Sequence, residues 1–108
     1  MTGQTGAELI AAERRRQVEV EGWTAEHDAA HRECQLLDAA ICYAGMAGSL
    51  LMDQDKGKEA KGGLLEAWPW NEQWWKPSDD PVRNLVKAGA LIAAEIDRIV
   101  NERGTTHA

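Results

Sequence analysis

Two long segments of the sequence carry apolar residues at the three- and four-residue spacing of an α-helix, and this pattern constrains the fold most. In the first segment, from about Glu33 to Asp53, the repeat is Leu36, Leu37, Ala40, Ile41, Ala44, Ala47, Gly48 and Leu51. In the second, the repeat is Val82, Leu85, Val86, Gly89, Ile92, Ala93, Ile96, Ile99 and Val100. Residues at this spacing share one side of a helix, so each segment must bury a face against another element.

The second of these helices has the clearest predicted boundaries. Asp80 is expected to cap its N-terminus and Pro81 to take the first helical position. Arg103 and Gly104 are expected to end it, leaving a frayed tail from residue 104. Small residues should let the two helices approach closely: these are Gly45, Gly48, Ala88, Gly89 and Ala90.

The rest of the chain predicts one further helix and two connections. The helix runs from about Gly6 to Glu21, and Gly22 follows where glycine takes the left-handed conformation without a Cβ penalty. Thr24 is expected to cap a single turn through Asp28. The polar, glycine-bearing stretch 54–63 predicts a mobile surface loop. No segment has the period of a strand, so residues 1–108 predict a single all-α domain, a three-helix bundle with additional short helices.

Charge and cysteine content narrow the function classes. The net charge is −6, whereas proteins that neutralise the phosphates of a duplex usually carry a basic face, so we expect no duplex nucleic acid as partner. No apolar run suggests a membrane span and the N-terminus lacks signal-peptide features, so we expect no membrane partner and a cytoplasmic location. Cys34 and Cys42 lie on one predicted helix roughly 12 Å apart, too far for a disulfide. They are therefore expected to be free thiols in a reducing compartment.

The aromatic residues are concentrated in one segment. The chain has five tryptophans, one tyrosine and no phenylalanine. Four of the tryptophans, Trp68, Trp70, Trp74 and Trp75, lie between residues 68 and 76, which end in Lys76 and are called the tryptophan segment. If Pro69 begins a short helix, Trp70 and Trp74 share one face of it. Two interpretations stay open. The indoles close one end of the helical core, or some are exposed and bind a planar ligand or a protein partner.

Catalytic and metal-binding patterns are incomplete. His27, Asp28, His31 and Cys34 fit no standard zinc spacing, so we predict no metal site and no cofactor. A MazG-like nucleotide pyrophosphohydrolase needs paired carboxylates on neighbouring helices to hold Mg²⁺. The available carboxylates, Glu33, Asp38, Asp53, Glu95, Asp97 and Glu102, do not form the required pairs. We therefore expect a protein without catalytic activity and keep a divergent pyrophosphohydrolase as a distant alternative.

Several motifs resemble a group of small, uncharacterised phage and prophage proteins. They are Glu13-Arg14, Arg16-Gln17, Gly22-Trp23-Thr24, Glu26-His27-Asp28, Trp68-Pro69-Trp70, Trp74-Trp75-Lys76-Pro77, Leu85-Val86-Lys87-Ala88 and Ala94-Glu95-Ile96. The resemblance covers most of residues 8–103 and implies a phage-related protein acting in a bacterial host cell, but it brings no established activity. The Gly22-Trp23-Thr24 motif and the helix start from Asp80 to Lys87 are also faintly similar to ryanodine-receptor-type repeat domains. Some of those modules are suspected of binding nucleotide-like ligands, although the tryptophan segment departs from their pattern.

These observations predict a binding module that captures a small nucleotide-derived ligand, which in a phage setting would sequester a host defence signal. The candidate ligand-binding residues are Arg14, Arg16, Gln17, Trp23, His27, Asp28, Trp68, Trp70, Trp74, Trp75, Lys76, Arg83 and Lys87. The alternative is a protein-interaction module, as a homo-oligomer or an inhibitor of a host protein, with the same tryptophans as anchors.

Overall fold

The fold is all-α, as the sequence predicts. The computed structural model describes residues 3–23 and 34–106, and within these ranges the chain forms helices and no strand. The elements are α1 (Gly6–Glu19), α3 (Gln35–Met52), α4 (Gln54–Leu65), the 3₁₀ helix η1 (Glu72–Trp74) and α5 (Pro81–Thr106). The predicted turn from Thr24 to Asp28 lies outside the described residues.

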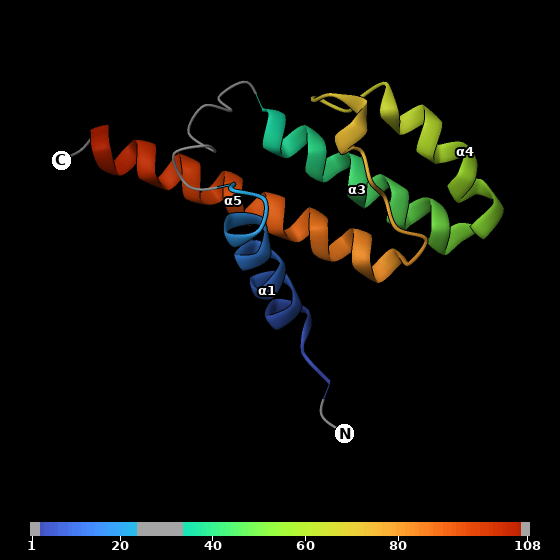
Figure 1. Ribbon diagram of the computed structural model, residues 1–108, viewed down its shortest axis with the longest axis horizontal. Helices are drawn as coiled ribbons and strands as arrows, with labels where there is room; N and C mark the ends of the chain where they lie inside the picture. The colour runs from blue at the N-terminus through green and yellow to red at the C-terminus, as the bar shows by residue number, and fades with distance from the viewer. Residues whose placement is uncertain (1–2, 24–33, 107–108) are drawn as a thin grey trace.

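The centre of the fold is an antiparallel pair formed by α3 and α5 (Figure 1). Helix α4 folds back along α3, and α1 packs across α5. The core lies between these elements and includes two side chains from the tryptophan segment. Its buried members are Leu36, Ala39, Ala40, Cys42, Tyr43, Met46, Leu50, Trp68, Trp75, Ala88, Leu91 and Ala94.

The expectation that no apolar run suggests a membrane span was wrong for α3. This helix is 18 residues long with a mean hydropathy of 1.3, which by length and composition alone would allow it to cross a membrane. In the fold it is a core helix, because residues such as Leu36, Tyr43 and Met46 are buried. Cys34 is exposed and Cys42 is buried, and both are free thiols as predicted.

The prediction of a loop at residues 54–63 was wrong, because this stretch lies within α4. The side chain of Asp53 caps the helix by accepting a hydrogen bond from the backbone N–H of Asp55, 2.9 Å away. Gly57 faces Leu50 of α3, where a Cβ would collide with the leucine side chain. Glycine and charged residues suggested a loop, but here glycine allows close helix packing, and tertiary contact overrides the low helix propensity.

Helix α5 begins as predicted and ends later. The Asp80 carboxylate accepts a hydrogen bond from the backbone N–H of Val82 at 2.9 Å, which caps the first turn. The fully buried Asn84 holds the preceding segment through two 2.8 Å hydrogen bonds with the backbone of Ser78. The helix continues to Thr106, beyond the predicted end at Arg103 and Gly104.

Two of the small residues that were predicted to lie between the long helices instead contact other helices. Gly89 of α5 faces Ile10 of α1, and Gly45 of α3 faces Leu64 of α4. The predicted glycine after the first helix is confirmed, since Gly22 has a φ of +74° in the left-handed region. A hydrogen bond of 2.9 Å from the Trp23 N–H to the Gln17 carbonyl then turns the chain back against α1.

Candidate functional site

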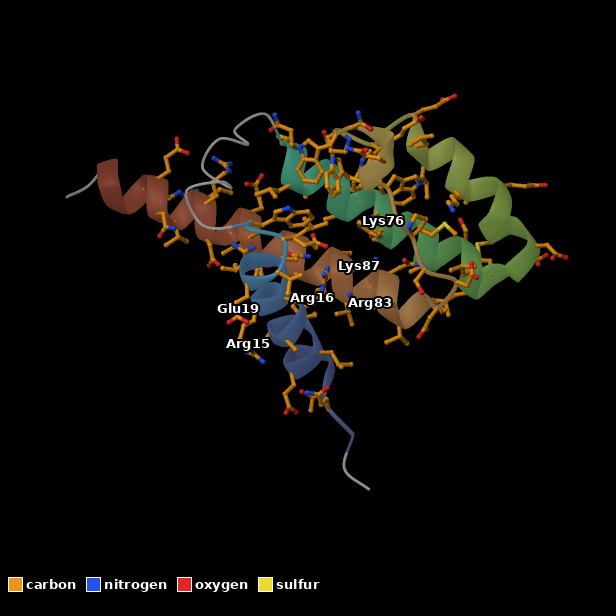
Figure 2. The ribbon with its side chains drawn as sticks, in the orientation of Figure 1. Arg15, Arg16, Glu19, Lys76, Arg83 and Lys87 are labelled. Atoms are coloured by element: carbon orange, nitrogen blue, oxygen red, sulfur yellow. The ribbon has the colours of Figure 1, made fainter. Side chains whose placement is uncertain are left out.

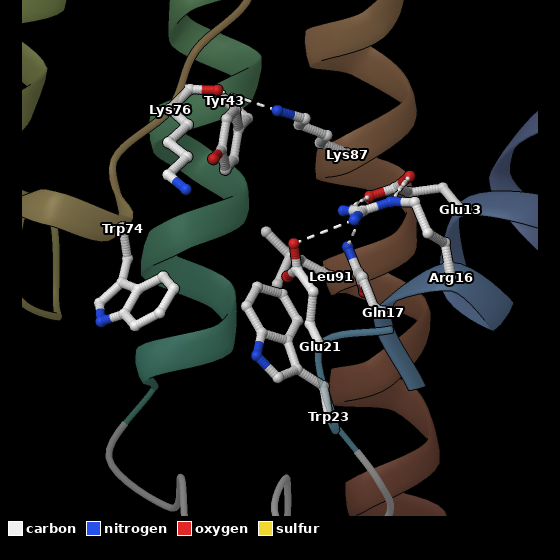
Figure 3. A pocket seen from close by; sticks show the side chains of 10 residues that line it. All are labelled: Glu13, Arg16, Gln17, Glu21, Trp23, Tyr43, Trp74, Lys76, Lys87 and Leu91. Atoms are coloured by element: carbon white, nitrogen blue, oxygen red, sulfur yellow. Dashed lines mark hydrogen bonds and ion pairs between the residues drawn. The ribbon is translucent and has the colours of Figure 1, made fainter. Parts of the chain in front are cut away.

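A small pocket lies where the end of α1 meets the tryptophan segment and the middle of α3 and α5 (Figure 3). Its volume is about 40 Å³, which is room for a few water molecules or one edge of a ligand. The lining residues are Glu13, Arg16, Gln17, Glu21, Trp23, Tyr43, Trp74, Lys76, Lys87 and Leu91. A larger ligand would therefore insert one group and lie across the mouth.

The pocket lining includes a buried carboxylate held by two arginines. Glu13 is only 3% exposed, and its oxygens form ion pairs with Arg16 at 2.8 Å and Arg83 at 2.7 Å. Burial alone would raise the pKa of Glu13, but hydrogen bonds from Arg16 and Arg83 outweigh this effect and lower it. Arg16 also pairs with Glu21 at 3.0 Å, and the hydrogen bond to Glu13 raises the arginine pKa. These ion pairs fix α1 against α5 at the pocket.

Gln17 presents an unused hydrogen-bond acceptor at the same place. Its amide nitrogen donates to Glu13 Oε2 at 3.4 Å, and because a carboxylate only accepts, the opposite orientation of the amide would set two acceptors together. The buried Gln17 Oε1 consequently has no hydrogen-bond partner among the described residues. Buried polar atoms are usually paired, so this oxygen is a candidate acceptor for a ligand N–H or O–H.

Two indoles and two lysines surround the mouth. The rings of Trp23 and Trp74 lie on opposite sides in Figure 3, and Trp74 is 52% exposed. The Lys76 Nζ lies 5.6 Å from the centre of the Trp74 ring. Lys87 donates to the Lys76 carbonyl at 2.9 Å and lies 5.2 Å from the centre of the Tyr43 ring. The mouth thus combines flat aromatic surfaces with two ammonium groups.

Burial affects the ionisable groups along this wall. It lowers the pKa of Lys87, and the positive charge of Arg83 acts in the same direction. It raises the pKa of Tyr43 to about 12. A bound anion would offset the cost of keeping the Lys87 ammonium charged in this partly buried position. In Figure 2, Arg16, Arg83, Lys76 and Lys87 lie on this side, while Arg15 projects from the other edge of α1.

The tryptophan segment divides into buried and exposed members. Trp68 and Trp75 are 7% and 6% exposed, and their N–H groups donate to the carbonyls of Asn71 and Lys61. Both rings pack against Tyr43, with centroid distances of 5.6 and 5.0 Å, so they belong to the core.

Trp70 is half-buried, with its ring centroid 5.4 Å from that of Trp68 and 6.0 Å from that of Trp23. The condition that Pro69 begins a helix is not met, because the helical turn starts at Glu72. Trp70 and Trp74 therefore do not share a helix face. Of the four tryptophans in the segment, Trp74 alone lines the pocket.

The structure brings six of the predicted site residues together at the pocket: Arg16, Gln17, Trp23, Trp74, Lys76 and Lys87. Arg14 instead donates to the Trp23 carbonyl at 3.2 Å, and Arg83 binds Glu13. His27 and Asp28 lie outside the described residues. Four lining residues were not among the predicted site residues: Glu13, Glu21, Tyr43 and Leu91.

The sequence held a partial signal for two of these. Glu13 lies four residues before Gln17 on α1, and Tyr43 is the only tyrosine of the chain. Leu91 looks like any core position of its helix. Only the contact between distant segments shows that it faces this pocket.

No protein-family model, curated protein or solved structure matches the chain. Within residues 3–23 and 34–106, no three or more histidine, cysteine, aspartate or glutamate side chains gather as they would around a metal ion.

Proposed function

We propose that the chain is a binding module for a small nucleotide-derived ligand, captured at the pocket between Trp23 and Trp74. The observation that carries the proposal is the combination of two pocket-lining indoles, two lysines and the unpaired buried oxygen of Gln17. A nucleotide offers a matching set of groups: a planar base, ring or exocyclic N–H donors, and a phosphate.

The base would stack on Trp74 or Trp23 and direct an N–H group to Gln17 Oε1. Stacking of a base on an aromatic side chain contributes about 1–3 kcal/mol. The phosphate would then be bound by Lys76 and Lys87, with charge-assisted hydrogen bonds of roughly 1.5–3 kcal/mol. Since the pocket admits only part of the ligand, these contributions correspond to affinities of about micromolar rather than nanomolar order.

The charges that line the pocket favour a ligand with few phosphates. Three cations, Arg16, Lys76 and Lys87, face two carboxylates, Glu13 and Glu21. Arg16 is already paired with both carboxylates, which leaves the two lysines for the ligand. A single phosphate or a cyclic phosphodiester fits this balance better than a triphosphate. In a phage-related protein, which the sequence resemblance implies, such binding would sequester a host signalling nucleotide.

Titration calorimetry with nucleoside mono- and triphosphates and cyclic nucleotides tests this proposal. We expect at least one monophosphate or cyclic nucleotide to bind, and Trp74→Ala or Lys76→Ala to weaken binding at least about tenfold. Arg15→Ala is the matched control, because it removes a cation on the other edge of α1 and should leave affinity unchanged. Absence of heat and of any tryptophan fluorescence change with every nucleotide would overturn the proposal.

The exposure of Trp74 beside Lys76 also supports a second candidate function, the capture of a host protein. Exposed tryptophans are frequent anchors of protein interfaces. Affinity purification from a bacterial lysate separates the candidates. A protein retained by the wild-type chain and lost with Trp74→Ala, together with no nucleotide response, would favour the protein partner.

A further inference from the structure

The α3–α5 pair exposes an unusual number of large apolar side chains away from the pocket. On α3 they are Leu37, Ile41, Leu51 and Met52, and on α5 they are Val82, Leu85, Ile92, Ile96 and Val100. Their exposed fractions run from 40% to 79%. A soluble domain normally places polar residues on the outer side of such helices, so these side chains require an explanation.

These residues lie on one side of the α3–α5 pair, here called the outer apolar face. Successive residues of a helix are rotated by roughly 100° about its axis. On both α3 and α5, the exposed apolar residues lie about a quarter turn away from the residues that pack against the other helix. Because α3 and α5 run antiparallel (Figure 1), both rotations lead to the same side of the pair. The tryptophan segment and the pocket lie on the other side, and α1 packs against α5 at the edge of the face, where Gly89 faces Ile10. Ala44 and Gly48, both exposed, fall between the large residues of α3.

We infer that the outer apolar face is the interface of a homodimer, in which two copies of the α3–α5 pair form a four-helix bundle. The first support is area. With roughly 150–200 Å² for each fully exposed aliphatic side chain, the nine residues present about 800 Å². This matches the area that each partner buries in a stable interface and exceeds the patches of most monomers.

The second support is charge. Asp38 is the only charged residue from Leu37 to Met52 on α3, and at roughly 100° per residue the charged residues of α5 between Val82 and Val100 lie on other sides of that helix. The face is therefore uncharged, although the chain carries a net charge of −6. Two copies with this net charge repel one another through most orientations. A two-fold arrangement that brings the uncharged faces together keeps the acidic surfaces apart.

The third support is spacing. On α3 the steps Leu37, Ile41, Ala44, Gly48 and Leu51 alternate between four and three residues. On α5, Val82 and Leu85 are three residues apart and Ile92 and Ile96 four, on either side of Gly89, which contacts Ile10 of α1. This is the spacing of side chains that interdigitate between helices in antiparallel bundles. A partner of unrelated sequence would not need it on both helices at once.

Sedimentation equilibrium tests the dimer directly. We expect the wild-type chain at about 10 μM to have twice the 11.9 kDa mass of one chain. Ile41→Glu and Ile96→Glu each place a charge twice in a two-fold interface and should weaken association at least about 100-fold. Val20→Glu is the control, because Val20 is 72% exposed but lies on the C-cap of α1, off the outer face.

Circular dichroism of each variant shows whether the helices are intact, since both positions are already solvent-exposed. A wild-type chain that stays monomeric would overturn the inference, whether or not it binds lipid vesicles or another protein. A dimer that is unaffected by both glutamate variants would overturn it as well. Nucleotide binding by the monomeric variants is measured separately, so failure of the pocket proposal leaves this inference standing.

Discussion

The packing of α1 on α5 depends on a position where the chain has no side chain. A Cβ on Gly89 would lie 2.5 Å from Ile10 Cδ1 and 2.8 Å from Ile10 Cγ1, whereas carbon atoms in contact normally lie about 3.5–4.0 Å apart. Gly89→Ala therefore forces Ile10 into another rotamer or displaces α1. Helix α1 carries Glu13, Arg16 and Gln17 to the pocket, so this contact also sets the pocket geometry.

Two effects of opposite sign determine the result. Alanine is favoured over glycine in a helix interior by about 0.5–1 kcal/mol. Forcing an additional methyl group into a packed contact costs about 1–3 kcal/mol. We expect the steric effect to dominate, so that Gly89→Ala lowers the free energy of unfolding by about 0.5–2 kcal/mol. In an Ile10→Ala background this contact is absent, and Gly89→Ala should raise the free energy of unfolding by about 0.5–1 kcal/mol.

Urea denaturation of the four proteins in this cycle, followed by circular dichroism, gives the coupling between the positions. We expect a coupling free energy of about 1–3 kcal/mol between Gly89 and Ile10. Gly62→Ala in α4 is the control, because nothing lies within 4 Å of its Cβ position, and it should stabilise the chain. If Gly89→Ala stabilised the wild-type background as Gly62→Ala does, the close packing of α1 described here would be incorrect.

Two further predictions concern ionisable groups at the pocket. Glu13→Gln leaves Arg16 and Arg83 without their shared carboxylate. The substitution should lower the free energy of unfolding by about 2–4 kcal/mol at neutral pH. A change below about 0.5 kcal/mol in urea denaturation would contradict this prediction. Folding lowers the pKa of Glu13. The contribution of the Glu13 carboxylate to stability is therefore fully present above the ordinary glutamate pKa and is lost as the pH falls below about 4. The free energy of unfolding of Glu13→Gln should consequently fall less steeply in acid than that of the wild-type chain. Tyr43, the only tyrosine, should ionise with a pKa of about 12 in an ultraviolet absorbance titration, and since this pKa is raised, its stabilising contribution is lost as the pH rises toward that value. A midpoint near the ordinary value of about 10 in a chain that circular dichroism shows to be folded would contradict the buried position.

Local chemistry made some elements predictable from the sequence. The start of α5 follows from Asp80 and Pro81, because both the N-cap hydrogen bond and the proline backbone angle act within one turn. The left-handed Gly22 is likewise a local property. These features do not depend on which other segment lies nearby.

Other elements depend on tertiary contact and could not be predicted. Helix α4 carries Gly57, Gly62 and Gly63, which weaken an isolated helix, and packing of Leu64 and Leu65 against the core accompanies its formation. Whether each indole is buried or exposed also depends on tertiary contacts. Trp68 and Trp75 are buried on Tyr43, more than twenty residues away in the sequence, while Trp74 points to the pocket.

The composition of α3 connects the core, the pocket and the outer apolar face. Asp38 is the only charged residue from Gln35 to Met52, so the helix is apolar on the side that packs inward and on the side that faces out. That composition is also why α3 is apolar enough to cross a membrane. A membrane-spanning α3 would not require α5 to carry a second uncharged stripe, and α5 bears charged residues elsewhere around its circumference, including Arg83, Lys87 and Asp97. Matching stripes on both helices of the pair, on the side away from the pocket, are what a two-fold helical interface requires.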